Sequence, residues 1–164
     1  MNGEFIGAPT FSFAARPSPV PGDLRISWRL AVIILMLAAS RGRRASLVKL
    51  HILNDAVRSA SSAELLDHIL GQRLSPLNWR MRVEPAFARA IDLLVGNRLA
   101  EWYGKDERRG LKLTAAGTAA ADQIALLEDA LAREKSVVAK FSKSVTEEWA
   151  QSLASARGLH SAQD

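Results

Sequence analysis

One stretch of the chain, residues 83–124, constrains the fold more than any other, because helix, strand and turn signals follow one another there without a gap. One apolar stripe at helical spacing is formed by Phe87, Ile91, Leu94 and Val95. Pro85 suits a first helical turn, and the pair Gly96-Asn97 tolerates the positive φ of a helix exit. The pattern predicts a helix over residues 84–95.

Two short strands and a second helix are predicted after it. Residues 99–103 form the first strand, and residues 111–113 form the second. A charged turn between Gly104 and Gly110 joins them. Thr114 is placed to cap a helix that begins at Ala115. The predicted order is helix, strand, charged loop, strand, helix.

This order resembles the second half of winged helix-turn-helix domains in bacterial regulators. The resemblance spans about residues 23–131 and is sharpest over 97–124, where Leu113-Thr114 leads into a helix with Gly117. It implies that the helix of residues 84–95 lies in the DNA major groove, while a wing tip over 105–109 touches the backbone. The expected fold class is mainly α with a small β-wing of two or three strands: a winged helix-turn-helix with a long C-terminal helix.

Composition and spacing suggest four segments in a chain of 164 residues. Residues 1–23 are rich in Pro and Gly and are expected to form a flexible arm. The winged-helix domain covers 24–114, and C-terminal helices for dimer or partner contact cover 115–156. Residues 157–164 are expected to be a frayed tail.

The first helix is expected over residues 25–40, with an unbroken apolar run at 30–39. The run is shorter than the roughly 20 residues that span a bilayer, so no membrane contact is expected. A signal peptide is rejected because the run starts too far into the chain. A buried helix of a small cytoplasmic protein is favoured.

Two more helices follow a basic turn at residues 41–44. Ser46 is placed to cap a helix over 47–57. Ser61 and Glu64 have capping-box spacing and are expected to start a third helix, which ends at Gly71.

The loop at residues 73–82 joins basic residues to an aromatic one and has two interpretations. Arg80 and Arg82 are candidates for phosphate contacts. Alternatively, Trp79 and Met81 pack into the core, and this second interpretation is slightly favoured.

The region after Ala115 is expected to form one long helix, because apolar residues recur at helical spacing as far as Val138. Such a helix would project past a small domain, and a second copy of the chain would cover its apolar stripe. Ser144 and Glu147 again have capping-box spacing, which predicts a last helix to about residue 154.

No catalytic constellation is found, so the protein is expected to be non-enzymatic and to need no metal or cofactor. The absence of cysteine excludes disulfides, thiolate catalysis and Cys-based zinc sites. The pairs His51/Asp55 and Asp67/His68 lack a third ligand or an orienting partner. No P-loop Lys-Ser/Thr follows the glycines of the charged turn.

Charge points to an anionic partner, because the net charge is +5 and residues 24–58 hold seven bases against one acid. The candidate DNA-binding residues are Arg43, Arg44, Arg80, Arg82, Arg89, Lys105, Arg108, Arg109 and Lys112. The recognition helix itself looks like a poor reader of bases, because Arg89 stands among the acids Glu84 and Asp92.

Two functions are therefore kept open. One is a dimeric transcriptional regulator that binds duplex DNA. The other follows from a looser resemblance, over residues 25–30 and 84–92, to the winged-helix middle component of ABC-three-component systems. It implies a protein-interaction subunit beside an ATPase partner in phage or plasmid defence. A structural subunit without nucleic-acid contact is a third alternative.

Overall fold

The structure, a computed structural model, describes residues 22–156, with the side chains of all of these except 22–24 and 107. The predicted arm, apart from its last two residues, and the predicted tail lie outside this range. The helices are α1 (Gly22–Ala38), α2 (Leu47–Arg58), α3 (Ala60–Leu70), α4 (Pro85–Gly96), α5 (Ala115–Leu126), α6 (Ala132–Phe141) and α7 (Glu147–Ala156). Short 3₁₀ turns occur at Arg41–Arg43, Pro76–Asn78 and Asp106–Arg108.

A small antiparallel sheet completes the described part of the chain. Its strands are β1 (Arg44–Ser46), β2 (Ala100–Tyr103) and β3 (Gly110–Leu113), in the order β1-β3-β2. Lys112 of β3 stands opposite Arg44 on one side and Glu101 on the other. The prediction of a mainly helical fold with a small β-hairpin is confirmed.

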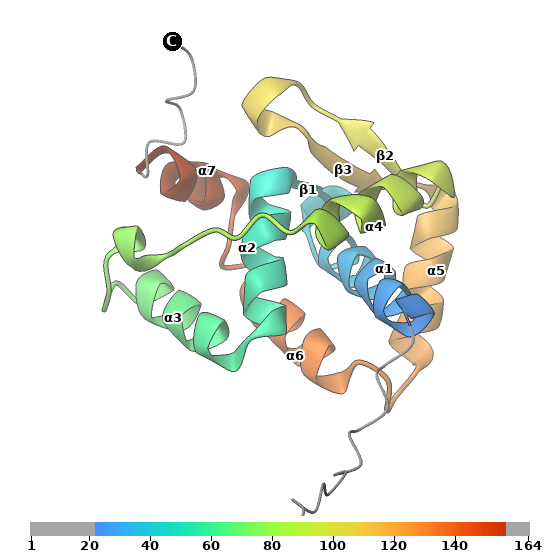
Figure 1. Ribbon diagram of the computed structural model, residues 1–164, viewed down its shortest axis with the longest axis horizontal. Helices are drawn as coiled ribbons and strands as arrows, with labels where there is room; N and C mark the ends of the chain where they lie inside the picture. The colour runs from blue at the N-terminus through green and yellow to red at the C-terminus, as the bar shows by residue number, and fades with distance from the viewer. Residues whose placement is uncertain (1–21, 157–164) are drawn as a thin grey trace, which may run out of the picture.

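The core is built around α1, which is apolar on nearly every side. Ile33, Met36 and Leu37 are fully buried. Figure 1 shows α1 at the centre, with α4 crossing in front of it, α5 beside it and the β2–β3 hairpin above. An all-round apolar helix needs cover on every face, and its neighbours provide that cover. None of the helices within residues 22–156 has the length and apolarity needed to cross a membrane.

Several local signals are confirmed at the positions where they were read. The Ser46 side chain accepts a hydrogen bond from Lys49 N at the start of α2, and Thr114 accepts one from Gly117 N at the start of α5. Trp79 is 2% exposed, and Met81 packs against the core. The second interpretation of the loop, with both side chains turned inward, is therefore correct.

The prediction of one long helix after Ala115 is wrong. The chain leaves the helix at Leu127, and Leu131 adopts a left-handed conformation with φ 59°. α6 then folds back against α1 and α2, where Val138 and Phe141 are buried. The part of the apolar stripe that Val138 contributes is thus covered by the chain's own core, whereas Leu127 stays 53% exposed.

Both predicted capping boxes are also wrong, each by two residues. α3 begins two residues earlier than expected, because Ser59 rather than Ser61 accepts from a helical N–H, that of Ser62. At α7 the cap is Thr146, which accepts from Trp149 N. In both places the hydroxyl of the residue directly before the helix accepts from an N–H group of the first turn.

Candidate nucleic-acid interface

The nine predicted DNA-binding residues all have exposed side chains, and they fall into two groups. The hairpin cations lie on or beside the sheet and its charged turn: Arg43, Arg44, Lys105, Arg108, Arg109 and Lys112. The helix cations lie on α4 and on the loop before it: Arg80, Arg82 and Arg89. Exposure makes every one of these groups accessible to an anion.

The charged turn between β2 and β3 is tightly built. Gly104 has φ +72°, and a Cβ there would collide with the backbone oxygen of Arg108. Arg108 N donates to Lys105 O over 3.1 Å, and Arg109 N donates to Asp106 O over 3.0 Å. The turn therefore presents its basic side chains from a constrained backbone.

Trp102 anchors one of these cations. The Arg109 guanidinium carbon lies 4.4 Å from the centre of the Trp102 ring, within the range of a cation–π contact. The ring is 38% exposed, so the arginine covers a face that water would otherwise meet. The contact holds Arg109 on the side of the hairpin that carries Trp102.

The opposite face of the sheet carries a second set of charges. Lys112 Nζ lies 3.7 Å from Glu101 Oε1, and both side chains are half exposed. Such a surface pair is weak because water screens it. Arg44 stands across from Lys112 and lies 5.5 Å from the Tyr103 ring centre.

Helix α4 presents an exposed face that is poor in charge. Its buried face contains Phe87, Ala90, Ile91 and Leu94. Its exposed residues are Pro85, Ala86, Ala88, Arg89, Asp92, Leu93 and Gly96. Arg89 is the only cation of this helix, so hydrogen bonding to several base edges would have to come from elsewhere.

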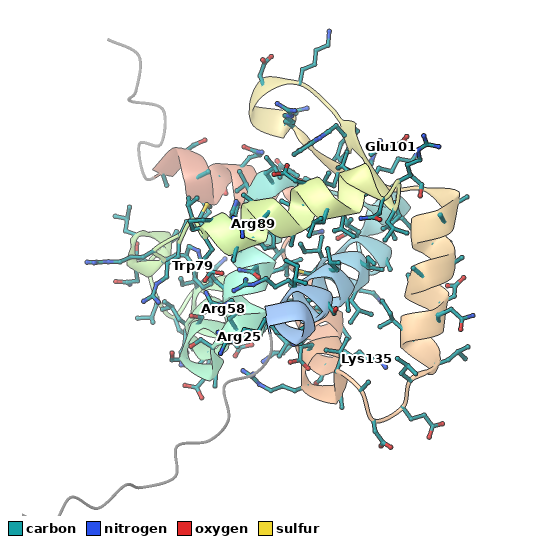
Figure 2. The ribbon with its side chains drawn as sticks, turned by 45° about the vertical axis from the view of Figure 1, so that its right-hand side comes forward. Arg25, Arg58, Trp79, Arg89, Glu101 and Lys135 are labelled. Atoms are coloured by element: carbon teal, nitrogen blue, oxygen red, sulfur yellow. The ribbon has the colours of Figure 1, made fainter. Side chains whose placement is uncertain are left out.

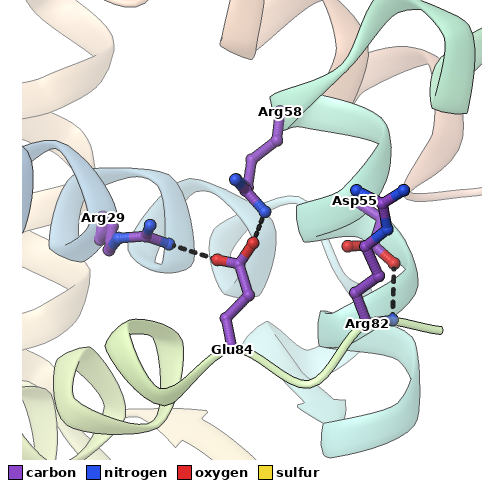
Figure 3. Close-up of polar contacts among 5 residues, drawn as sticks. All are labelled: Arg29, Asp55, Arg58, Arg82 and Glu84. Atoms are coloured by element: carbon purple, nitrogen blue, oxygen red, sulfur yellow. Dashed lines mark hydrogen bonds and ion pairs between the residues drawn. The ribbon is translucent and has the colours of Figure 1, made fainter.

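Glu84, at the start of α4, is held by two arginines from other helices, as Figure 3 shows. Arg29 Nη1 of α1 lies 2.9 Å from Glu84 Oε2, and Arg58 of α2 pairs with the other carboxylate oxygen. The Glu84 side chain is only 16% exposed. Two cations therefore neutralise Glu84, which leaves Asp92 as the exposed acid of the predicted recognition helix.

Arg29 and Arg58 at this junction, and Arg25 one turn before Arg29, were not among the predicted site residues. Arg58 contacts the Glu84 carboxylate at the start of α4, and Figure 2 labels Arg25 on the first turn of α1. Arg25 and Arg29 are four residues apart, a spacing that places both on one side of α1. This i, i+4 spacing relates Arg25 to Arg29 and gives no signal for Arg58, which lies on α2.

Asp55 of α2 fixes the loop that precedes α4. Its carboxylate is buried and accepts a hydrogen bond from Arg82 N over 3.4 Å, as drawn in Figure 3. Burial raises the pKa of Asp55, while the Arg82 hydrogen bond and the charges of Arg58 and Arg82 oppose the rise. With Trp79 buried nearby, the loop holds Arg80 and Arg82 at the surface.

Two titratable side chains of α2 serve the core instead of the interface. Lys49 is buried and donates from Nζ to Ser142 O over 3.0 Å, and burial lowers its pKa. His51 lies 4.8 Å from Phe87, ring centre to ring centre, and burial lowers its pKa also. Among the described residues, no group of three or more acidic or histidine side chains could hold a metal ion.

Comparison with protein-family models, with curated proteins and with solved structures found no match to this chain. What the site can do is therefore judged from the geometry of its own residues.

Proposed function

We propose that this protein is a winged helix-turn-helix protein that binds duplex DNA and acts as a bacterial transcriptional regulator. In this proposal α4 is the recognition helix and the β2–β3 hairpin is the wing. The order of elements supports it, since α4 leads directly into β2 and β1 pairs with the far side of β3. Helix α3 and the loop 71–84 stand between α2 and α4, where a minimal helix-turn-helix has a short turn.

The observation that carries the proposal is the basic hairpin turn beside α4. Lys105, Arg108 and Arg109 are exposed on a constrained backbone, and β2 packs against α4. Phosphate contacts from such cations supply most of the non-specific affinity for DNA. Arg89 is the single basic candidate for base contact on α4, so we expect strong salt dependence and modest sequence preference.

The proposal is tested by the double substitution Arg108→Gln/Arg109→Gln. We expect duplex affinity to fall at least tenfold for every sequence, and the salt dependence to become flatter by about two counterions. The matched control is Arg133→Gln/Lys140→Gln, which removes two charges from α6, and it should stay within threefold of the wild type. Equal duplex affinity of the hairpin variant and the wild type at low salt contradicts the proposal.

A second candidate is a winged-helix subunit that binds protein partners in a multi-component ATPase system for phage or plasmid defence. The exposed apolar side chains favour it: Leu77 is 60% exposed and Val83 is 78% exposed, both just before α4. In this case Leu77→Ser/Val83→Ser should abolish copurification with a coexpressed ATPase partner and leave folding intact. Stable copurification of that variant contradicts the second candidate.

A second copy of the chain stays a proposed partner as well. Leu126 and Leu127, at the end of α5, are 72% and 53% exposed. Leu127 belongs to the predicted apolar stripe and stays uncovered where the chain folds back into α6.

A further inference from the structure

A cavity of about 760 Å³ lies where the turn after α1, the outer face of the sheet and the α6–α7 junction meet. Its lining includes four cations, Arg41, Arg44, Lys49 and Lys143, against two carboxylates, Glu147 and Glu148. A second cavity of about 560 Å³ adjoins it and adds Arg108 of the hairpin to the same lining. These volumes lie in the range of small-molecule sites.

The cavity already holds one negative group in a fitted position. The Glu147 carboxylate accepts from Ser46 N, with its two oxygens 3.1 and 3.3 Å away. Ser46 caps α2, so this carboxylate sits at a helix N-terminus, where backbone N–H groups attract anions. The Glu147 carboxylate thus occupies a position at the start of α2 where an anion is favoured.

The four cations of the lining outnumber its two carboxylates, so the cavity carries net positive charge. Lys49 is 4% exposed, and its bond to Ser142 O directs its ammonium group to the α6–α7 junction. Tyr103 and Thr146 complete the lining between the sheet and α7. Such a surround favours a ligand that brings more than one negative charge.

We propose that this cavity is a binding site for a small polyphosphate anion, such as pyrophosphate or the phosphate chain of a nucleotide, which competes with Glu147 for Ser46 N. Release of Glu147 frees the start of α7 from the sheet. In Figure 1, α7 lies beside the upper end of α2 and the hairpin leans towards it. A regulatory effect on DNA binding rests on the proposed function, whereas the anion site itself does not.

The test is titration calorimetry of the full chain with pyrophosphate at constant ionic strength. The cavity variant is Arg41→Gln/Lys143→Gln, and the matched control is Arg133→Gln/Lys140→Gln on α6. We expect pyrophosphate to bind the wild type and the control within twofold of each other, and the cavity variant at least tenfold more weakly. Glu147→Gln should bind severalfold more tightly, because the competing charge is gone.

Absence of pyrophosphate binding at millimolar concentration overturns the proposal, as does equal weakening in the control. Duplex DNA affinity, measured on the same variants, separates this result from the proposed function. Loss of pyrophosphate binding alone in the cavity variant identifies a free polyphosphate as the ligand. Joint loss of both identifies a DNA phosphate as the occupant of the same site. Duplex binding without any pyrophosphate binding leaves the proposed function intact and rejects the cavity site.

Discussion

The charged residue that matters most for the position of α4 is Glu84, which joins three helices through Arg29 and Arg58. The Arg29 and Glu84 side chains are largely buried, at 17% and 16% exposure, and Arg58 is 36% exposed. A carboxylate in that setting makes charge-assisted hydrogen bonds that are stronger than surface ion pairs. Its partners lie 55 and 26 residues away in the sequence, so no local spacing could have predicted them.

Substitution of Glu84 by Gln should lower the free energy of unfolding by about 1–3 kcal/mol, because two arginines lose their shared counter-charge. Urea denaturation at neutral pH measures this. The control is Glu64→Gln on the exposed side of α3, which should change stability by less than about 0.5 kcal/mol. Equal midpoints for the two variants would show that the junction adds nothing to stability.

His51 gives the fold a pH dependence of known sign. Burial lowers the pKa of His51 below its usual 6.5, so the folded state favours the neutral ring. The stabilisation is complete above pH 6.5 and is lost as the pH falls from 6.5 through the folded-state pKa, because the unfolded chain then binds the proton first.

The variant His51→Leu should therefore lose less thermal stability than the wild type between pH 7.5 and pH 5. Leucine keeps an apolar contact with Phe87 and cannot be protonated. Melting temperatures at a series of pH values measure the difference. Parallel curves for the two proteins would mean that His51 has the same pKa in the folded and the unfolded state.

At the scale of elements, the junction between the hairpin and α5 depends on Gly117. A Cβ at this position would overlap the backbone oxygen of Leu99 and lie 3.0 Å from Leu113 Cδ2. The first turn of α5 thus packs directly on the backbone that leads into β2. This close approach also positions the hairpin relative to the helices.

Gly117→Ala should cost at least about 2 kcal/mol of stability, since backbone must move to admit the methyl group. Gly96→Ala is the matched control, because nothing lies within 4 Å of its Cβ position. At the end of α4 that control should be neutral or stabilising by up to about 1 kcal/mol. Chemical denaturation of both variants decides the matter, and a stable Gly117→Ala protein would refute the close packing.

Local signals were enough to predict most elements of the hairpin region. Pro85 at the start of α4, Thr114 at the start of α5 and the flanking glycines of the charged turn act within a few residues, and each was read correctly. The break between α5 and α6 was missed because Leu131 is an unusual residue for a left-handed conformation. Its cause is tertiary: α6 finds cover on α1 and α2.

For the whole molecule, exposure of the nine candidate residues could be predicted from their chemistry, but their electrostatic surroundings could not. Lys49 is one of the seven bases counted in residues 24–58, yet its side chain is buried and bonds to Ser142 O at the α6–α7 junction. Glu84 was counted against DNA binding, yet Arg29 and Arg58 neutralise it. Long-range pairing of this kind depends on the fold and leaves no periodic trace in the sequence.

The most direct test of the central proposal is equilibrium binding of the full chain to duplex DNA across a salt series, with mixed-sequence competitor. We expect affinity to fall steeply with salt, with a slope of several counterions, and to depend only modestly on sequence. The hairpin variant Arg108→Gln/Arg109→Gln should bind duplex DNA more weakly than the wild type at every salt concentration. No measurable binding at low salt would contradict the account, and the interface would then have to serve a protein partner.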